Sequence, residues 1–106
     1  MMLGELIFSH AGDVLSPIVD RPALTAAFVF QVSQISPSGS PSLAITILHR
    51  NRDETSFSTA VALAAITAAG TYAATAENLR DFVQIKYVMS GTNTWARVFT
   101  FQPATQ

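Results

Sequence analysis

The sequence contains no cysteine, which excludes disulfide bonds, thiol nucleophiles and thiolate metal sites. Charged residues are also scarce, at 12% of the 106 residues against roughly 25% in ordinary soluble domains. A small domain with so few charges leaves weakly polar surface exposed, and such surface is often covered by a partner or a sister subunit. With 49% hydrophobic residues, the chain is predicted to fold as one domain around a single core.

Basic residues are few and scattered, and the formal net charge is -1. This composition argues against nucleic-acid binding through phosphate contacts. Long apolar runs are missing as well. The Ala-rich stretch 59–70 is too short to span a bilayer, which needs roughly 20 helical residues, and Glu5 precedes any apolar run that could serve as a signal peptide. We therefore expect neither nucleic acid nor a membrane as a partner.

Histidine occurs only at His10 and His49, so any general-base chemistry depends on these two residues. A hydrolytic site would pair one of them with a serine and an aspartate. The candidates are Ser9 or Ser56 with Asp13 or Asp53. No GxSxG nucleophile motif is present, and the serines lie in clusters typical of turns. We therefore predict that the chain is not an enzyme and that His49 is a surface or interface residue at a strand end.

The polar segment after His49 offers oxygen donors for a cation at Asn51, Asp53 and Glu54. Arg50 and Arg52 would repel a calcium ion there, so a solvated loop is predicted instead. The glycines are isolated and form no loop that could hold a phosphate, and no carboxylate pair suggests a glycosidase. The sequence predicts no metal and no cofactor.

Apolar side chains recur at every second position in several short segments, which is the period of a β-strand. The clearest segments are 23–35, 43–50, 82–89 and 95–102, and clusters of Gly, Pro, Ser and Asn separate them. Seven or eight such strands predict an all-β fold, an antiparallel β-sandwich resembling a jelly roll. We assign residues 23–106 to this domain and residues 1–22 to an N-terminal part that is either a docking arm or an edge strand with a loop.

The stretch 60–76 is ambiguous because nine of its residues are Ala, which favours helix, whereas its Val, Ile, Thr and Tyr favour strands. We predict two strands that meet at or near Gly70. The segment 76–81 is predicted as either one helical turn or a loop.

One phrase occurs twice, Ser38-Gly39 and Ser90-Gly91, each followed by hydroxyl residues and an alternating segment. Two copies of a ligand loop are one interpretation. We favour two hairpins of the same turn chemistry, which place Leu43 and Trp95 inward at equivalent positions.

In the last segment Trp95 shares a face with Phe99 and Phe101, so that this face is predicted to be core. Arg97 lies between them and is expected to extend to the rim of the sheet, to pair with a carboxylate such as Asp81, or to reach a neighbouring subunit. A different interpretation makes aromatic residues a sugar-binding platform. Its members would be Trp95, Tyr72 and Tyr87.

From Phe28 onward the order of motifs resembles a family of small structural proteins of tailed bacteriophages and prophages. The similarity rests on SGSPSLAITI, RNRDETSF, ITAAGTY and LRDFVQIKYVMSGTNTWARVFTF. It leaves out residues 1–22, and Arg52-Asp53-Glu54 stands where the family pattern has an Asp-Gly or Asn-Gly turn.

The resemblance implies a virion component, and several proteins of this kind are capsid decoration or cement subunits. It implies the major capsid protein as the partner, and a location on the capsid surface after assembly in the host cytoplasm. We expect a homodimer or homotrimer, with the dimer preferred. The candidate partner contacts are His49, Arg50, Arg52, Asp53 and Arg97. The alternatives are a carbohydrate-binding module on a tail or fibre and a tail-tube or head-completion subunit.

Overall fold

The computed structural model describes residues 2–8, 12–16, 18–20 and 24–101. Within this part of the chain the regular structure consists of nine strands. They are β1 (Met2–Phe8), β2 (Gly12–Leu15), β3 (Val19–Asp20), β4 (Ala26–Ile35), β5 (Ser42–Arg50), β6 (Ser58–Ala62), β7 (Gly70–Ala76), β8 (Phe82–Ser90) and β9 (Ala96–Phe101). The predicted strand segments are confirmed, and 77–81 is a loop.

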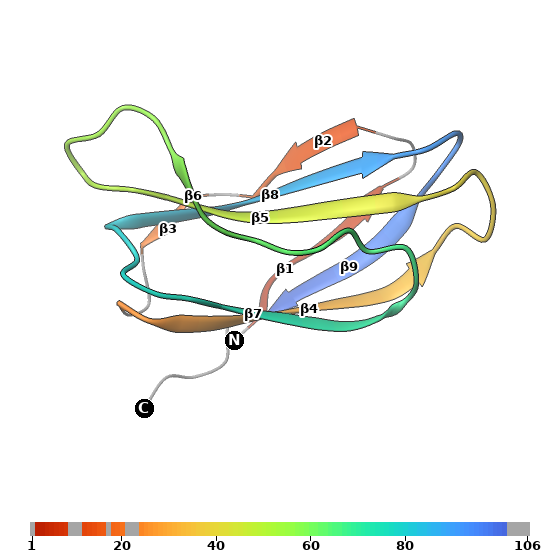
Figure 1. Ribbon diagram of the computed structural model, residues 1–106, viewed down its shortest axis with the longest axis horizontal. Helices are drawn as coiled ribbons and strands as arrows, with labels where there is room; N and C mark the ends of the chain where they lie inside the picture. The colour runs from red at the N-terminus through yellow and green to blue at the C-terminus, as the bar shows by residue number, and fades with distance from the viewer. Residues whose placement is uncertain (1, 9–11, 17, 21–23, 102–106) are drawn as a thin grey trace.

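The strands form two antiparallel sheets that pack face to face (Figure 1). Sheet A has the order β1-β9-β4-β7, and sheet B has the order β2-β8-β5-β6, with β3 also paired to β8. β2 pairs with one half of β8 and β3 with the other, so the two short strands act as pieces of one edge strand. The described part of residues 1–22 therefore lies along the edges of both sheets.

The chain passes from one sheet to the other at every connection except β5–β6 and β2–β3, the latter joining the two pieces of one edge strand. This alternation, in which strands distant in sequence become neighbours, is the arrangement of a jelly roll. The predicted all-β antiparallel sandwich is confirmed. One consequence matters for function: the β5–β6 and β7–β8 connections lie at one end of the sandwich, and the β4–β5 and β8–β9 connections lie at the other (Figure 1).

The core lies between the sheets and is filled by the alternating side chains that the sequence indicates. Alternate apolar residues of β4, β5 and β8 are at most 3% exposed, namely Ala26, Met89 and nine large side chains from the middle of these strands. The nine are Phe28, Phe30, Val32, Leu43, Ile45, Ile47, Val83, Ile85 and Tyr87. Because one face of each strand carries large apolar groups and the other does not, burial of that face decides its orientation.

The prediction of which face of β9 is buried is wrong. Its buried side chains are Ala96, Val98 and Thr100, whereas Trp95 is 37% exposed and Arg97 is exposed. The reason is space: the ring of Tyr87 meets Phe30 edge-on at 6.4 Å between centroids, and Thr100, the neighbour of Phe30 in the sheet, hydrogen-bonds the Tyr87 hydroxyl. These large rings from β4 and β8 leave room for only small side chains from β9.

The two Ser-Gly turns are not hairpins. β4 and β5 belong to different sheets, as do β8 and β9, so both turns carry the chain across the sandwich. The first turn leads from sheet A to sheet B, and the second leads from sheet B to sheet A. The residues at the equivalent position after each turn also differ in burial: Leu43 is buried, but its counterpart Trp95 is exposed. The repeat is nevertheless part of the scaffold, because Thr92 N donates to Gly39 O at 3.0 Å and holds the turns together.

Residues 60–76 contain strand and no helix, as predicted, but the two strands do not meet at Gly70. β6 ends at Ala62 in sheet B, and β7 begins at Gly70 in sheet A. Between them, Ile66 forms an isolated bridge to Leu43 and is buried. The high Ala content of this stretch therefore does not produce a helix.

Candidate functional site

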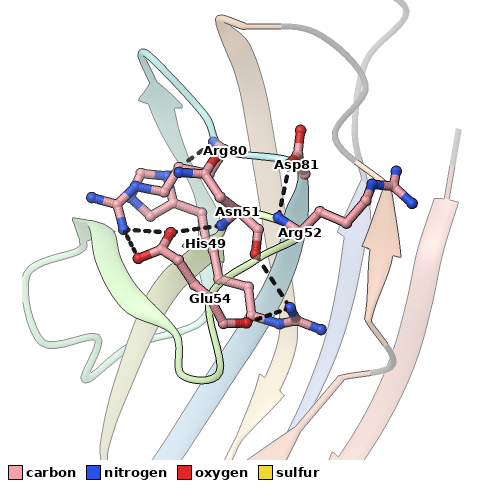
Figure 2. Close-up of polar contacts among 7 residues, drawn as sticks. His49, Asn51, Arg52, Glu54, Arg80 and Asp81 are labelled. Carbon is pink, nitrogen blue, oxygen red and sulfur yellow. Dashed lines mark hydrogen bonds and ion pairs between the residues drawn. The ribbon is translucent and has the colours of Figure 1, made fainter.

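Four of the five residues predicted as partner contacts lie at one end of the sandwich, where the β5–β6 and β7–β8 connections meet (Figure 2). We call the polar residues that meet there the polar end. Its members are His49, Arg50, Asn51, Arg52, Asp53, Glu54, Arg80 and Asp81. A turn organises it: Glu54 N donates to Asn51 O at 3.0 Å, and Asn51 N donates to Glu54 Oε1 at 2.7 Å.

Glu54 joins the two connections through an ion pair with Arg80. Arg80 Nη1 lies 3.1 Å from each carboxylate oxygen, and both side chains are about one-third exposed. The hydrogen bond from Asn51 N, followed by the charge of Arg80, lowers the pKa of Glu54 against an opposing effect of desolvation. Exposed pairs of this kind contribute little to stability, so the bridge positions the loops more than it stabilises the fold.

His49 lies below this bridge, is buried, and accepts a hydrogen bond at Nδ1 from the backbone amide of Arg80, with 3.3 Å between the nitrogens. Desolvation lowers the pKa of His49, the charge of Arg80 lowers it further, and Glu54 acts in the opposite direction. A catalytic triad needs Nδ1 to donate to a carboxylate, whereas here Nδ1 is an acceptor. His49 is therefore arranged as a structural link between β5 and the β7–β8 connection.

The two arginines of the segment lie over aromatic rings. The guanidinium carbon of Arg50 is 4.7 Å from the centroid of Phe82 and 5.3 Å from that of Phe57, and that of Arg52 is 5.1 Å from Phe82. Arg50 Nη1 also donates to Glu54 O at 2.8 Å. Such stacking holds long side chains in place and leaves part of the charge facing outward.

Asp81 and Asp53 differ in their hydrogen bonding. Asp81 Oδ2 accepts a hydrogen bond from Arg52 N at 2.8 Å, whereas Asp53 is exposed and makes no polar contact with the described residues. The polar end carries equal numbers of charges of each sign. The positive residues are Arg50, Arg52 and Arg80, and the negative ones are Asp53, Glu54 and Asp81. It is therefore a charge-balanced surface and not a basic patch.

Arg97 is the one predicted contact that the structure places elsewhere. It lies near the start of β9 in sheet A, at the end of the sandwich opposite Asp81 (Figure 1), so these two residues do not pair. Its guanidinium carbon is 5.2 Å from the centroid of Phe99, and its carbonyl accepts from Ser33 Oγ at 3.3 Å. Arg97 and Phe99 thus belong to the outer face of sheet A, and the exposed Trp95 directly precedes β9.

The described residues contain no group of His, Asp or Glu side chains that could hold a metal ion. Ser9 and His10, considered above for a hydrolytic site, lie outside the described residues. Tyr87, considered for sugar binding, is 2% exposed and is therefore not available as a platform. Tyr72 is half-buried, and its hydroxyl donates to Ala68 O at 2.6 Å.

Exposed apolar side chains that the sequence did not single out occur in β2 and β3, which pair with β8, and in the residues up to the start of β4. Four large apolar side chains within these ten residues are between 37% and 59% exposed. Leu15 lies opposite Lys86, Val19 lies opposite the buried Val83, and Leu24 lies beside the β7–β8 connection. We call this set the apolar edge: Leu15, Ile18, Val19 and Leu24. The short apolar pairs on either side of Pro17 were the available signal, but alternation was too weak to indicate which side chains face outward.

The backbone of the apolar edge is held firmly against the sandwich. Ser16 N donates to Ile85 O and Ser16 Oγ accepts from Ile85 N, both at 2.9 Å. Gln84 Nε2 donates to Ser16 O at 2.9 Å, and Leu79 N donates to Leu24 O at 2.8 Å. The described backbone of these residues is thus tied to β8 and to the β7–β8 connection, and β3 lies toward the polar end (Figure 1).

Comparisons with protein-family models, curated proteins and solved structures found no match to the chain. In the described part of the chain, no helix is long and apolar enough to cross a membrane. Function is therefore inferred from the fold, the motif resemblance and the surfaces described above.

Proposed function

We propose that the chain is a non-enzymatic structural subunit that binds the outside of a tailed-phage head shell as a decoration or cement protein. The motif resemblance supports this class of function. The jelly roll supports it by analogy of fold, because jelly rolls are common among viral capsid proteins, although they also occur in lectins.

The observation that carries the proposal is the apolar edge. Large apolar side chains that project from a fixed backbone into water are costly to leave uncovered, and grouped exposure of this kind marks a surface for another protein. Because the backbone is already ordered, binding there costs little conformational entropy. The apolar edge and the adjacent polar end together have the composition of an interface, apolar in one part and polar in the other.

The mechanism is mechanical. Each subunit contacts the shell through the apolar edge, and the balanced charges of the polar end, among them Arg52 and Asp53, set its orientation rather than supply net attraction. Many copies held by the symmetry of the shell join neighbouring shell subunits and raise the work needed to rupture the particle. No cofactor and no metal take part.

The first test is the position of the gene, since a decoration protein is expected beside a major capsid gene. The direct test is cosedimentation of the purified chain with emptied heads of the phage concerned, together with the heat resistance of those heads. We expect binding and a gain in heat resistance. Heads that neither bind the chain nor gain heat resistance would contradict the proposal.

Variants locate the contact. The double substitution Leu15→Ser and Leu24→Ser removes the two most exposed members of the apolar edge and is expected to weaken binding at least tenfold. Trp95→Ser, an exposed apolar residue at the other end of the sandwich, is the matched control and is expected to bind like wild type. Equal binding by both variants would show that the apolar edge is not the contact.

A sugar-binding module is the second candidate, and the exposure of Trp95 favours it. An exposed indole can stack on a sugar ring, and the chain has a single Trp, so its fluorescence reports on that position alone. Quenching of this fluorescence by glycans, without binding to heads, would favour the sugar-binding function. Ring-shaped oligomers under the electron microscope would instead indicate a tail-tube or head-completion subunit.

A further inference from the structure

The edge of the sandwich formed by β6 and β7 has not entered the proposed function. β7 pairs with β4 on one side and is the last strand of sheet A, and β6 is the last strand of sheet B. Between these two edges lies an open groove of about 420 Å³. It is lined by Val61, Ala62, Leu63, Ala64, Ala65, Tyr72, Ala73, Ala74 and Thr75.

This edge carries no charge. No charged residue and no proline occur in the sequence between Glu54 and Glu77, a segment that contains both strands. Proteins usually protect a free strand edge with charged side chains, proline or a covering loop, because its unpaired N–H and C=O groups would otherwise pair with another chain. The edges on the other side of the sandwich contain carboxylates, with Glu5 in β1, Asp13 in β2 and Asp20 in β3.

We propose that β7 pairs with β7 of a second copy of this chain, antiparallel about a two-fold axis at Ala73. The resulting register is self-complementary: Thr71 lies opposite Thr75 of the other copy, and Tyr72 lies opposite Ala74. A two-fold interface requires this reciprocity, in which each residue and its partner exchange roles. Sheet A would then continue through both copies as one sheet.

Three features of β7 favour a second copy over an unrelated peptide. Identical strands can meet here because no like charges face one another, whereas the carboxylates of the opposite edge would be duplicated across a two-fold axis. Thr–Thr pairs are favourable across antiparallel strands, and this register places Thr71 opposite Thr75 in both directions. The hydroxyl of Tyr72 is held by Ala68 O, so the one large side chain of the strand is already ordered before pairing.

The inference deepens the proposed function, since it names the surface for the self-association expected there. It leaves the apolar edge and the polar end free for the shell, because no member of either set belongs to β7. Its tests need no capsid, so failure of the dimer and failure of shell binding can be told apart.

The first test measures molar mass by sedimentation velocity over a wide range of concentration. Wild type is expected to be dimeric, and Ala73→Lys is expected to be monomeric, because it places two ammonium groups side by side at the two-fold axis. Gln31→Lys is the matched control: Gln31 is exposed on the same face of sheet A, but in the inner strand β4, so this variant should remain dimeric. A wild-type monomer, or a dimer that Ala73→Lys leaves intact, would overturn the inference.

The second test uses the absence of cysteine, which gives engineered cysteines no background. Under mild oxidation Ala73→Cys should form a disulfide-linked dimer by itself, because residue 73 faces its own copy. Thr71→Cys and Thr75→Cys should each cross-link poorly alone but efficiently when the two variants are mixed. Equal cross-linking of all three alone would exclude this register.

Discussion

The amide of Thr92 donates a hydrogen bond of 3.0 Å to the carbonyl oxygen of Gly39, so the two Ser-Gly turns of the sequence rest on one another. Both glycines have positive φ, 86° at Gly39 and 114° at Gly91. A Cβ at Gly39 would lie 2.1 Å from Thr92 O, and a Cβ at Gly91 would lie 2.6 Å from Gly39 O. The contact therefore explains why the sequence repeats Ser-Gly at these two points.

Gly39→Ala and Gly91→Ala are each expected to lower the free energy of unfolding by more than about 1 kcal/mol, because both the backbone conformation and the contact reject a side chain. Urea denaturation measures the effect. Ser38→Ala, at an exposed position in the same turn, is the control and should change stability by less than about 0.5 kcal/mol. If either glycine variant were as stable as wild type, the turns would not be in contact.

Tyr87 and Thr100 form a hydroxyl–hydroxyl hydrogen bond in the core. Tyr87→Phe and Thr100→Val are each expected to cost about 1–3 kcal/mol, because a buried hydroxyl loses its partner. The double variant should cost less than the sum of the two, because neither hydroxyl is left behind. A double-mutant cycle in urea measures this coupling, and strict additivity would mean that the two hydroxyls do not interact.

The lowered pKa of His49 predicts a loss of stability in mild acid. As the pH falls through about 6.5, the unfolded chain takes up a proton at residue 49 that the folded chain refuses, so the free energy of unfolding decreases until the pH reaches the folded pKa. Below the ordinary value of 4.5, protonation of Glu54, whose folded pKa is also lowered, removes a further contribution. Denaturation at several pH values measures both phases.

His49→Asn is the matched control, since an Asn side chain offers an acceptor close to the position of Nδ1 but does not titrate. Its stability should depend less on pH between about 6.5 and 5 than that of wild type. His10 is present in both proteins and cancels from the comparison. An identical pH dependence in the two would mean that His49 titrates alike in the folded and unfolded chains.

Replacement of Ser36 by alanine is expected to increase the free energy of unfolding. Its side chain is 4% exposed, and Oγ has no hydrogen-bond partner among the described residues, although its backbone amide donates to Trp95 O at 2.9 Å. Ser36→Ala removes the unpaired hydroxyl and keeps the backbone bond, so stability should rise by about 1 kcal/mol. Thermal denaturation measures the change, and a lower melting temperature would show that Oγ is bonded in solution.

Much of the fold follows from the sequence alone. In β4, β5 and β8 one face carries groups such as Phe30, Ile45 and Ile85 at every second position, and the other face carries smaller or more polar side chains. Burial of the larger apolar face is decided by composition, which needs no knowledge of the partner strands. In β9 both faces carry apolar residues, so composition alone could not indicate which face is buried. The prediction that the larger residues point into the core was therefore wrong.

The candidate site, too, could be predicted from the sequence only in part. The segment 49–54 was predicted as one polar group because its members are adjacent in the chain, but its partners Arg80 and Asp81 lie far away in sequence. Arg97 was grouped with them because a charged residue between aromatic ones suggested a contact with Asp81 or a neighbouring subunit, but the topology places it at the other end of the sandwich. The apolar edge escaped notice because exposure, and not sequence pattern, distinguishes it.

The sequence by itself determined which segments are strands, because alternation and turn residues are local properties. It also determined that the two Ser-Gly phrases are turns. Only the tertiary structure decided that these turns cross between sheets instead of closing hairpins, because the same turn chemistry serves both. That choice depends on which distant strands pair, and pairing depends on how side chains from both sheets, among them Phe30 and Tyr87, fill the space between the sheets.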